Sequence, residues 1–196
     1  MYNKVKLIGT LKKFYPQDNI ADVEVKRLSG VVDTIKVIYE QDPVELIKLF
    51  DKDILVEGII YTKNIVVNER THLNIFVKGT IMLWKNFSEE PYTGDTNEVE
   101  IKGYIVKPPT IRQTPLGKTI TELCVAVNDD NHESYYIPVI TFGGLAERCY
   151  KYQVSNYVKI IGRLQSRQYE KQTLRGPVIK TAYEVVARNS YIQTED

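Results

Sequence analysis

Apolar and polar residues alternate with a period near two along most of this chain, which is typical of β-strands with one buried face. In the first half the pattern predicts a short helix near 43–51 and strands near 2–14, 20–27, 31–39, 53–63 and 73–85. In the second half it predicts a helix near 143–152 and strands near 98–107, 118–128, 134–142, 156–169 and 177–190. The two halves therefore share one element order.

A repeated phrase indicates that the halves are copies of each other. NKVKLIGTL, which begins at Asn3, returns as NEVEIKGYI, which begins at Asn97. Both phrases contain a glycine at the same position, Gly9 and Gly103, and a glycine inside a strand marks a bulge or a bend. A period this long exceeds the roughly 20–50 residues of a solenoid unit, so each copy is expected to be a whole small domain.

The element order in each half identifies the expected fold. Five strands with a helix between the third and the fourth is the order of the OB-fold, a Greek-key barrel whose exposed sheet face commonly binds oligonucleotides or oligosaccharides. We therefore predict an all-β protein with two tandem OB-folds, over 1–86 and 97–196, joined by a linker over 87–96 that lacks periodicity. A sandwich of more, shorter strands would not supply a helix at the same place in both halves.

Composition narrows the class of protein. The chain is 43% hydrophobic with a formal net charge of +1, and it has no apolar run of about 18 residues and no signal-peptide core after Met1. We expect a cytoplasmic protein without a membrane partner. His72 and His132 lack companion ligands, and TPLGKT lacks the earlier glycine of a phosphate loop. We therefore predict no metal, no cofactor, no catalytic residue and no enzymatic activity.

Five ordered segments over roughly 97–188 carry a family resemblance: NEVEIKGYI, RQTPLGKTITELCVAV, YYIPVITFGGLAE, GRLQSRQYE and YEVVARN. Together they resemble the bacterial single-stranded DNA-binding proteins. The resemblance implies sequence-independent binding and protection of single-stranded DNA in replication, repair or recombination. It also implies a homodimer that presents four OB domains, association with the nucleoid when DNA is bound, and replication or repair proteins as further partners.

Basic and aromatic residues are expected to share one face of the second domain. Alternate residues of a strand share a face, so the odd-numbered residues from 163 to 169 point away from the core. Cations there would contact phosphates, and exposed rings would stack on unpaired bases. The candidate nucleic-acid-binding residues are Tyr104, Arg112, Lys118, Tyr136, Phe142, Arg163, Gln165, Arg167, Tyr169, Lys171 and Arg175. The resemblance assigns base stacking to Tyr136, Phe142 and Tyr169.

The distribution of charge separates the two domains. Residues 151–180 contain seven Lys or Arg and one acid, and residues 101–121 contain four and none, whereas residues 1–94 contain thirteen of each sign. Ile65 occupies the position of the first copy that corresponds to Tyr169. We predict an asymmetric pair, in which the second domain binds strongly and the first extends the path or mediates assembly. Candidate contacts in the first domain are Tyr39, Tyr61, Lys63 and Arg70.

Other interpretations of the same residues remain open. Aromatic residues are favoured in strands for packing alone, and solvent-facing strands often carry Arg and Lys for solubility. A tandem OB scaffold could instead be a protein-interaction module, similar to a primosome component. Single-stranded RNA is a closer alternative ligand, because a ring and a basic groove do not distinguish the two sugars.

Overall fold

The computed structural model describes residues 2–67, 70–84, 96–114, 116–129, 133–173 and 176–193, and the predicted linker lies outside these ranges except for Thr96. The first half contains β1 (Asn3–Tyr15), β2 (Ile20–Lys26), β3 (Val32–Ile38), α1 (Pro43–Ile47), β4 (Asp53–Val67) and β5 (Arg70–Leu83). The second contains β6 (Asn97–Ile105), β7 (Thr110–Gln113), β8 (Thr119–Asn128), β9 (Ser134–Phe142), α2 (Gly143–Tyr150), β10 (Tyr157–Thr173) and β11 (Gly176–Ile192). No helix in the described ranges has the length and apolarity needed to cross a membrane.

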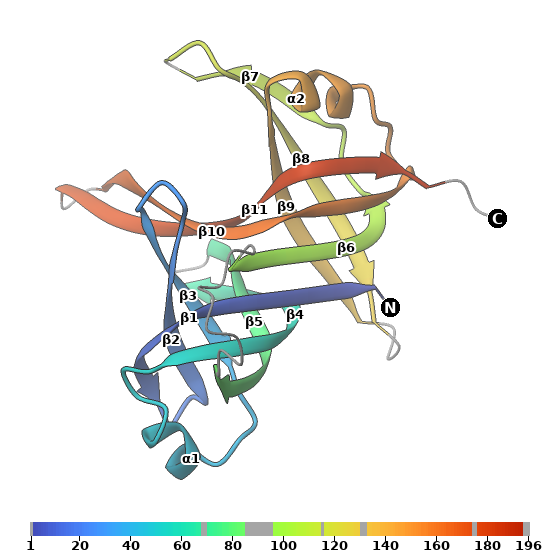
Figure 1. Cartoon of the computed structure of the whole chain (residues 1–196). Helices are drawn as coiled ribbons and strands as arrows, with labels where there is room; N and C mark the ends of the chain where they lie inside the picture. Colours follow the sequence, from blue (N-terminus) through green and yellow to red (C-terminus); the bar gives the residue numbers. More distant parts are fainter. Residues whose placement is uncertain are drawn as a thin grey trace.

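Each half closes into its own barrel (Figure 1). In the first half the pairings run β1–β2–β3–β5–β4 and return from β4 to β1. The second half repeats the circuit as β6–β8–β9–β11–β10 and back to β6. In both, a helix connects the third strand of the barrel to the fourth. The prediction of an all-β chain with two tandem OB-folds is confirmed.

Several elements differ from the prediction. Helix α1 ends at Ile47, and the turns that follow it include Asp51 at a φ of 57°, a left-handed conformation that does not continue a helix. Strand β7 was not predicted; it pairs with the start of β8. Strand β10 extends to Thr173, beyond its predicted end at 169, because it pairs with β11 as far as Gly176.

The two barrels share one continuous sheet, because β1 pairs with β6 in antiparallel orientation (Figure 1). Val5 lies opposite Val99, and these two residues occupy the same position in the repeated phrase. An antiparallel pair centred on equivalent positions relates the two copies by an approximate twofold rotation. The repeated phrase therefore forms both the first strand of each barrel and the junction between the barrels.

The asparagine that opens each copy has one structural role in both. The Asn3 side chain accepts a hydrogen bond from Ile60 N at 2.9 Å and donates one to Ile60 O at 2.9 Å. The Asn97 side chain makes the same two bonds with Leu164, at 2.9 and 2.6 Å. At these two asparagines the strand backbone pairs with the first strand of the other barrel. Each buried side-chain amide therefore supplies the hydrogen bonds to β4 or β10 that the backbone no longer makes. A side chain that lacks either an amide donor or an acceptor would leave buried groups unpaired.

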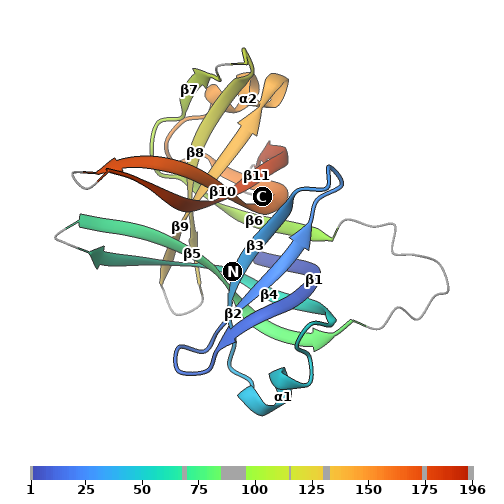
Figure 2. The same cartoon turned by 90° about the vertical axis from the view of Figure 1, so that its left-hand side faces the viewer.

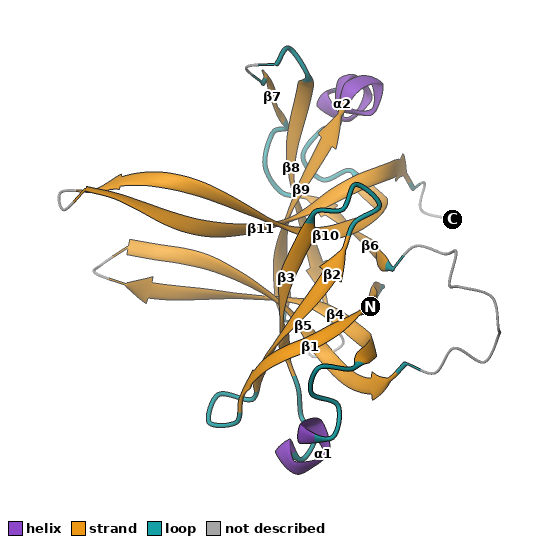
Figure 3. Ribbon diagram, turned by 60° about the vertical axis from the view of Figure 1, so that its left-hand side comes forward, coloured by secondary structure: helices purple, strands orange, loops and turns teal. Residues whose placement is uncertain are grey.

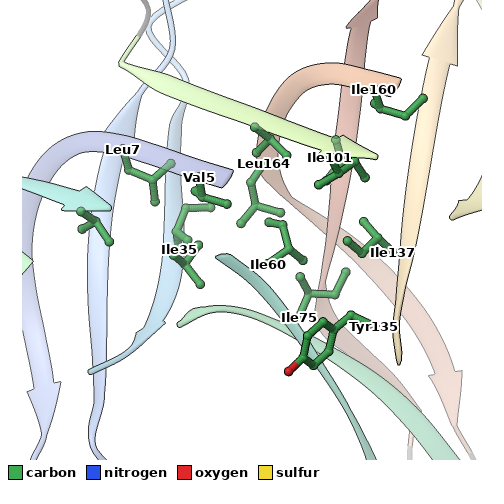
Figure 4. Packing of buried hydrophobic residues seen from close by; sticks show 14 of the residues in the cluster. Val5, Leu7, Ile35, Ile60, Ile75, Ile101, Tyr135, Ile137, Ile160 and Leu164 are labelled. Carbon is green, nitrogen blue, oxygen red and sulfur yellow. The ribbon is translucent and has the colours of Figure 1, made fainter. Parts of the chain in front are cut away.

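One apolar core runs through both barrels. Figure 4 shows Ile60 and Ile75 of the first barrel beside Ile137 and Leu164 of the second. Gly9 and Gly103 allow the first strand of each barrel to cross close to the next one, because a Cβ at either position would overlap a backbone carbonyl oxygen of β2 or β8. The core fixes the barrels against each other, and the outward faces of their strands remain for other contacts.

Candidate nucleic-acid interface

The outer face of the second barrel, formed by β8, β9, β11 and β10, carries several of the predicted residues. Along β9, residues Ile137 and Val139 are buried in the core, while Tyr136 and Phe142 point outward and are 46% and 40% exposed. Ile140 lies between them on the same face, in a small apolar cluster with Ile120 and Val186. Strand alternation therefore places one ring on each side of an outward apolar cluster.

A second aromatic site continues from Tyr136 around the barrel. Ala126 of β8 pairs with Tyr136 on one side and with Tyr104 of β6 on the other. The alanine leaves space between the two rings, which are two strand spacings apart, about 10 Å. The Tyr104 ring is 41% exposed and packs against the Tyr157 ring, with 4.9 Å between their centroids. The structure thus brings Tyr104 and Tyr136 onto one outward row.

The odd-numbered residues of β10 are not equally accessible. Tyr169 is 38% exposed, and the guanidinium of Arg167 lies 5.7 Å from the centre of its ring. Gln165 is buried, and its amide donates a hydrogen bond to Glu184 at 3.0 Å. Arg163 is half-buried, and its Nε has no hydrogen-bond partner among the described residues. Arg167 and Tyr169 therefore form the accessible part of this strand.

Two acids share this face with the predicted cations. Glu184 of β11 lies 3.7 Å from Arg167, and Glu122 of β8 lies 2.8 Å from Arg112. Both arginines are about half exposed, so a phosphate can reach them only in competition with these carboxylates. Neither acid was among the residues predicted for the site. Their proximity arises from cross-strand pairing, which the local pattern does not reveal.

A groove of about 560 Å³ lies between the β4–β5 hairpin and the β10–β11 hairpin. Figures 2 and 3 show the two hairpins side by side, projecting in the same direction from their barrels. One wall includes Arg167, Tyr169 and Lys180, and the other includes His72 and Leu73. Pro138, Ile140 and the acids Glu122 and Glu184 also line the groove. Lys180, His72 and Leu73 were not among the predicted binding residues, although Lys180 is one of the seven basic residues counted over 151–180.

Tyr183 also lines this groove, and it keeps its proton at neutral pH. Burial raises the pKa of Tyr183 to about 12, and the negative charge of Asp22 acts in the same direction. Tyr183 can therefore present a neutral ring and hydroxyl to a ligand, and it adds no negative charge that would repel phosphate. Its contribution to the groove is aromatic surface from the strand opposite β10.

The other predicted residues lie at the ends of the hairpins. Lys118 is exposed at the turn between β7 and β8, where Gly117 adopts a φ of 76°. The backbone of Lys171 belongs to β10, but its side chain lies outside the described part of the structure, and so does the whole of Arg175. His132, considered earlier as a metal ligand, also lies outside the described ranges.

At the places equivalent to Tyr136 and Phe142, the first barrel has no aromatic residue. The pairs Val37–Val77 and Val139–Val185 occupy equivalent places in the two barrels, so Tyr136 corresponds to Thr34, and Phe142 corresponds to Glu40. Tyr39 is fully buried, so the suggestion that it contacts nucleic acid is wrong. Tyr61 is half-buried against the ring of Tyr135 in the second barrel, at 5.5 Å. Lys63 and Ile65 are exposed on the projecting part of β4.

A comparison with protein families finds a match over the second barrel. A model described as the single-strand binding protein family matches residues 96–193, which is half of the chain and contains the whole of the second barrel. Single-stranded DNA-binding protein 2 of Streptococcus agalactiae serotype V is 33% identical over 82 residues, which cover 38% of this chain. The matched stretch spans 63% of the length of that relative.

Solved structures resemble the complete two-barrel arrangement. The wild-type single-stranded DNA binding protein from Thermus aquaticus aligns with a TM-score of 0.72 at 21% identity, over 99% of this chain and 94% of that one. A deletion mutant of the same protein aligns with a TM-score of 0.72 at 22% identity, over 99% and 95%. At this level of identity the likeness shows that the fold is shared, with both barrels and their junction included.

Proposed function

This chain belongs to the single-strand binding protein family, and we propose that it binds single-stranded DNA without regard to sequence and protects the bound strand. The mechanism is capture by binding alone, with no chemical step. Cations displace counterions from the phosphates, and exposed rings stack on unpaired bases at about 1–3 kcal/mol each. Such binding keeps a strand from pairing again and from nucleases during replication, repair or recombination.

The observation that carries the proposal is the cluster of exposed rings on one outer face. Tyr136, Phe142 and Tyr169 are each about two-fifths exposed, although aromatic side chains of this size are usually more buried. They share the face with Arg167 and with the groove between the hairpins. Packing of the core does not require these rings, whereas stacking on bases does.

We assign the strongest binding to the second barrel and a weaker role to the first. The second barrel has outward rings at Tyr136 and Phe142, whereas Thr34 and Glu40 occupy these places in the first. The first barrel contributes the β4–β5 hairpin, whose His72 and Leu73 face the groove. A bound strand would therefore contact both barrels, with most of its stacking energy coming from the second.

We also propose that the chain assembles as a homodimer that presents four barrels. The outward side of the shared β1–β6 sheet carries Lys4, Lys6, Glu98 and Glu100 around a shallow hollow of about 480 Å³. Interleaved charges of both signs can pair with a second copy of the same surface in an isologous contact. Localisation in the cytoplasm at the nucleoid, with replication or repair proteins as partners, belongs to the same proposal.

Fluorescence anisotropy with labelled oligo-dT, oligo-U and duplex DNA of equal length tests the ligand. We expect binding to oligo-dT that weakens with salt, with a log–log slope of about 0.7 for each neutralised phosphate. Tighter binding to oligo-U would identify the chain as an RNA binder. Equal, weak binding to all three ligands would refute the proposal and favour a protein-interaction module.

A further inference from the structure

We propose that the first barrel positions the binding face of the second, and that Asp33, Arg27 and Thr62 are the positioning residues. This inference rests on the proposed binding of single-stranded DNA. Two of the polar contacts between the barrels each hold the backbone of a strand next to candidate binding residues. We call them the Asp33 contact, which reaches Ser166 of β10, and the Thr62 contact, which reaches Tyr136 of β9.

The Asp33 contact is a buried charged cluster. Asp33 is fully buried, and its carboxylate accepts two hydrogen bonds from Arg27, both at 2.6 Å. The same carboxylate accepts hydrogen bonds from the backbone N–H of Ser166 at 2.8 Å and from its hydroxyl at 3.1 Å. Arg27 also donates to the backbone carbonyl of Ser166 at 3.1 Å. One ion pair of the first barrel thus satisfies the hydroxyl and both backbone groups of a single residue in the second.

The place of this contact along β10 explains why it matters. The ladder between β6 and β10 ends at Gly162, and the Asn97 side chain then binds the N–H of Leu164. Since N–H groups on one edge of a strand recur every two residues, the next one belongs to Ser166, which binds Asp33. The first barrel therefore fixes the edge of β10 at the residue between Gln165 and Arg167.

The Thr62 contact fixes the second strand of the site. The backbone N–H of Tyr136 donates a hydrogen bond to the Thr62 hydroxyl at 3.1 Å. Beside it, the Tyr135 ring packs against Tyr61, and the Tyr135 hydroxyl donates to Asp129 at 3.1 Å. Tyr136 carries one of the exposed rings of the site. The hydrogen bond to β4 of the first barrel therefore holds the backbone from which that ring projects.

Thr62 and Ser166 are equivalent residues, each four positions after the glycine of its strand, Gly58 or Gly162. In both cases a hydroxyl on the projecting strand meets the third strand of the other barrel. Both contacts adjoin groups of the second barrel's binding face, which gives the first barrel an effect on DNA binding without strong contacts of its own. A site held in its binding geometry loses less side-chain freedom when DNA binds.

The test uses the full chain with two variants. The first, Arg27→Leu with Asp33→Ala, removes both charges of the Asp33 contact and leaves no unpaired ion. The second, Thr62→Val, removes the acceptor for Tyr136 at nearly constant volume. The matched control is Lys12→Leu with Asp51→Asn, which removes an ion pair of 2.5 Å within the first barrel and leaves the net charge unchanged.

Affinity for oligo-dT is measured at a temperature where every protein is folded, together with its salt slope and the amide hydrogen exchange of Ser166 and Tyr136. We expect each positioning variant to bind roughly three- to tenfold more weakly than the control, which corresponds to about 0.5–1.5 kcal/mol per side chain newly immobilised on binding. The salt slope should not change, because no phosphate contact is removed. Hydrogen exchange should accelerate at Ser166 in the first variant and at Tyr136 in the second.

Three results would overturn the inference. The first is faster exchange with an affinity that matches the control. The second is a loss of affinity accompanied by a smaller salt slope, since Arg27 would then contact phosphate directly. The third is full affinity in Thr62→Val, which remains informative if the double variant does not fold. Failure of the unmodified chain to bind oligo-dT would instead refute the proposed function, so the two failures are distinguishable.

Discussion

Replacing the Tyr136 ring gives the most direct test of base stacking. Tyr136→Ala removes a side chain that is 46% exposed, so about 100 Å² of buried surface is lost, which costs roughly 2–3 kcal/mol of folding free energy. A domain with a stability of roughly 5–15 kcal/mol remains folded at 25 °C after such a loss. The backbone hydrogen bond from Tyr136 to Thr62 is retained, because it does not involve the ring.

The affinity for DNA should fall for a separate reason. A stacked base contributes about 1–3 kcal/mol, which corresponds to about 5- to 150-fold in affinity at 25 °C. Because Phe142 and Tyr169 remain, we expect a loss near the lower end, about five- to tenfold. The measurement is anisotropy of labelled oligo-dT across a salt series, with thermal unfolding recorded on the same samples. The salt slope should be unchanged.

Two further variants separate stacking from a general effect on stability. Tyr136→Phe keeps the ring, so its affinity should match that of the unmodified chain. Tyr150→Ala removes a tyrosine that is 50% exposed on helix α2, away from the candidate face, so it should lower the melting temperature without weakening binding. If Tyr136→Ala binds oligo-dT as tightly as Tyr150→Ala does, Tyr136 does not stack on a base.

Three other predictions concern charge, backbone packing and pH. Glu184→Gln should raise the affinity for oligo-dT by up to about fivefold, because it releases Arg167 from an ion pair whose arginine side is half exposed, and such a pair is worth about 0.2–1 kcal/mol. Gly103→Ala should destabilise the chain by about 1–3 kcal/mol in urea unfolding, because the added Cβ would overlap the carbonyl oxygen of Ala126. Burial raises the pKa of Tyr183 to about 12. The folded state is therefore expected to lose stability as the pH rises from about 10, the ordinary tyrosine value, toward 12. Tyr183→Phe should reduce that loss in melting temperatures measured across this range.

Each of these predictions has a matched comparison. Asp51→Asn removes one negative charge from the first barrel, so an equal gain in affinity there would show that net charge, not Arg167, is responsible. Gly144→Ala adds a Cβ in helix α2 where nothing lies within 4 Å, so it should not destabilise the chain. A loss equal to that of Gly103→Ala would refute the packing argument. An unchanged alkaline profile in Tyr183→Phe would assign the sensitivity to other tyrosines.

Local patterns predicted the positions of the strands better than their ends. The family resemblance led us to expect that Tyr136 and Phe142 offer their rings for base stacking, and both rings are exposed on β9. The lengths of β10 and β11 depend on each other, because beyond the barrel each of these strands pairs with the other across the hairpin. Alternation becomes weak there, since both faces of the projecting hairpin are partly exposed.

The sequence predicted the face of the candidate site but not the acidic residues that lie on it. Arg167 and Gln165 were expected to point outward together, but Gln165 is buried and bound to Glu184, which also lies near Arg167. The three residues meet because β10 and β11 pair in one register, with Gln165 opposite Glu184. A register that joins residues about twenty positions apart cannot be inferred from the period of either strand alone.

By itself, the sequence determined the class of the fold, its duplication and the inward or outward side of most strand residues, because period-two alternation and the repeated glycines act locally. Only the tertiary structure decided which strands and side chains meet. The pairing of β1 with β6 and the hydrogen bonds from Ser166 to Asp33 join residues that lie from about 90 to 133 positions apart. Local pattern specifies that a side chain or an N–H is available, but its partner is selected by barrel closure and by the core that holds the two barrels together.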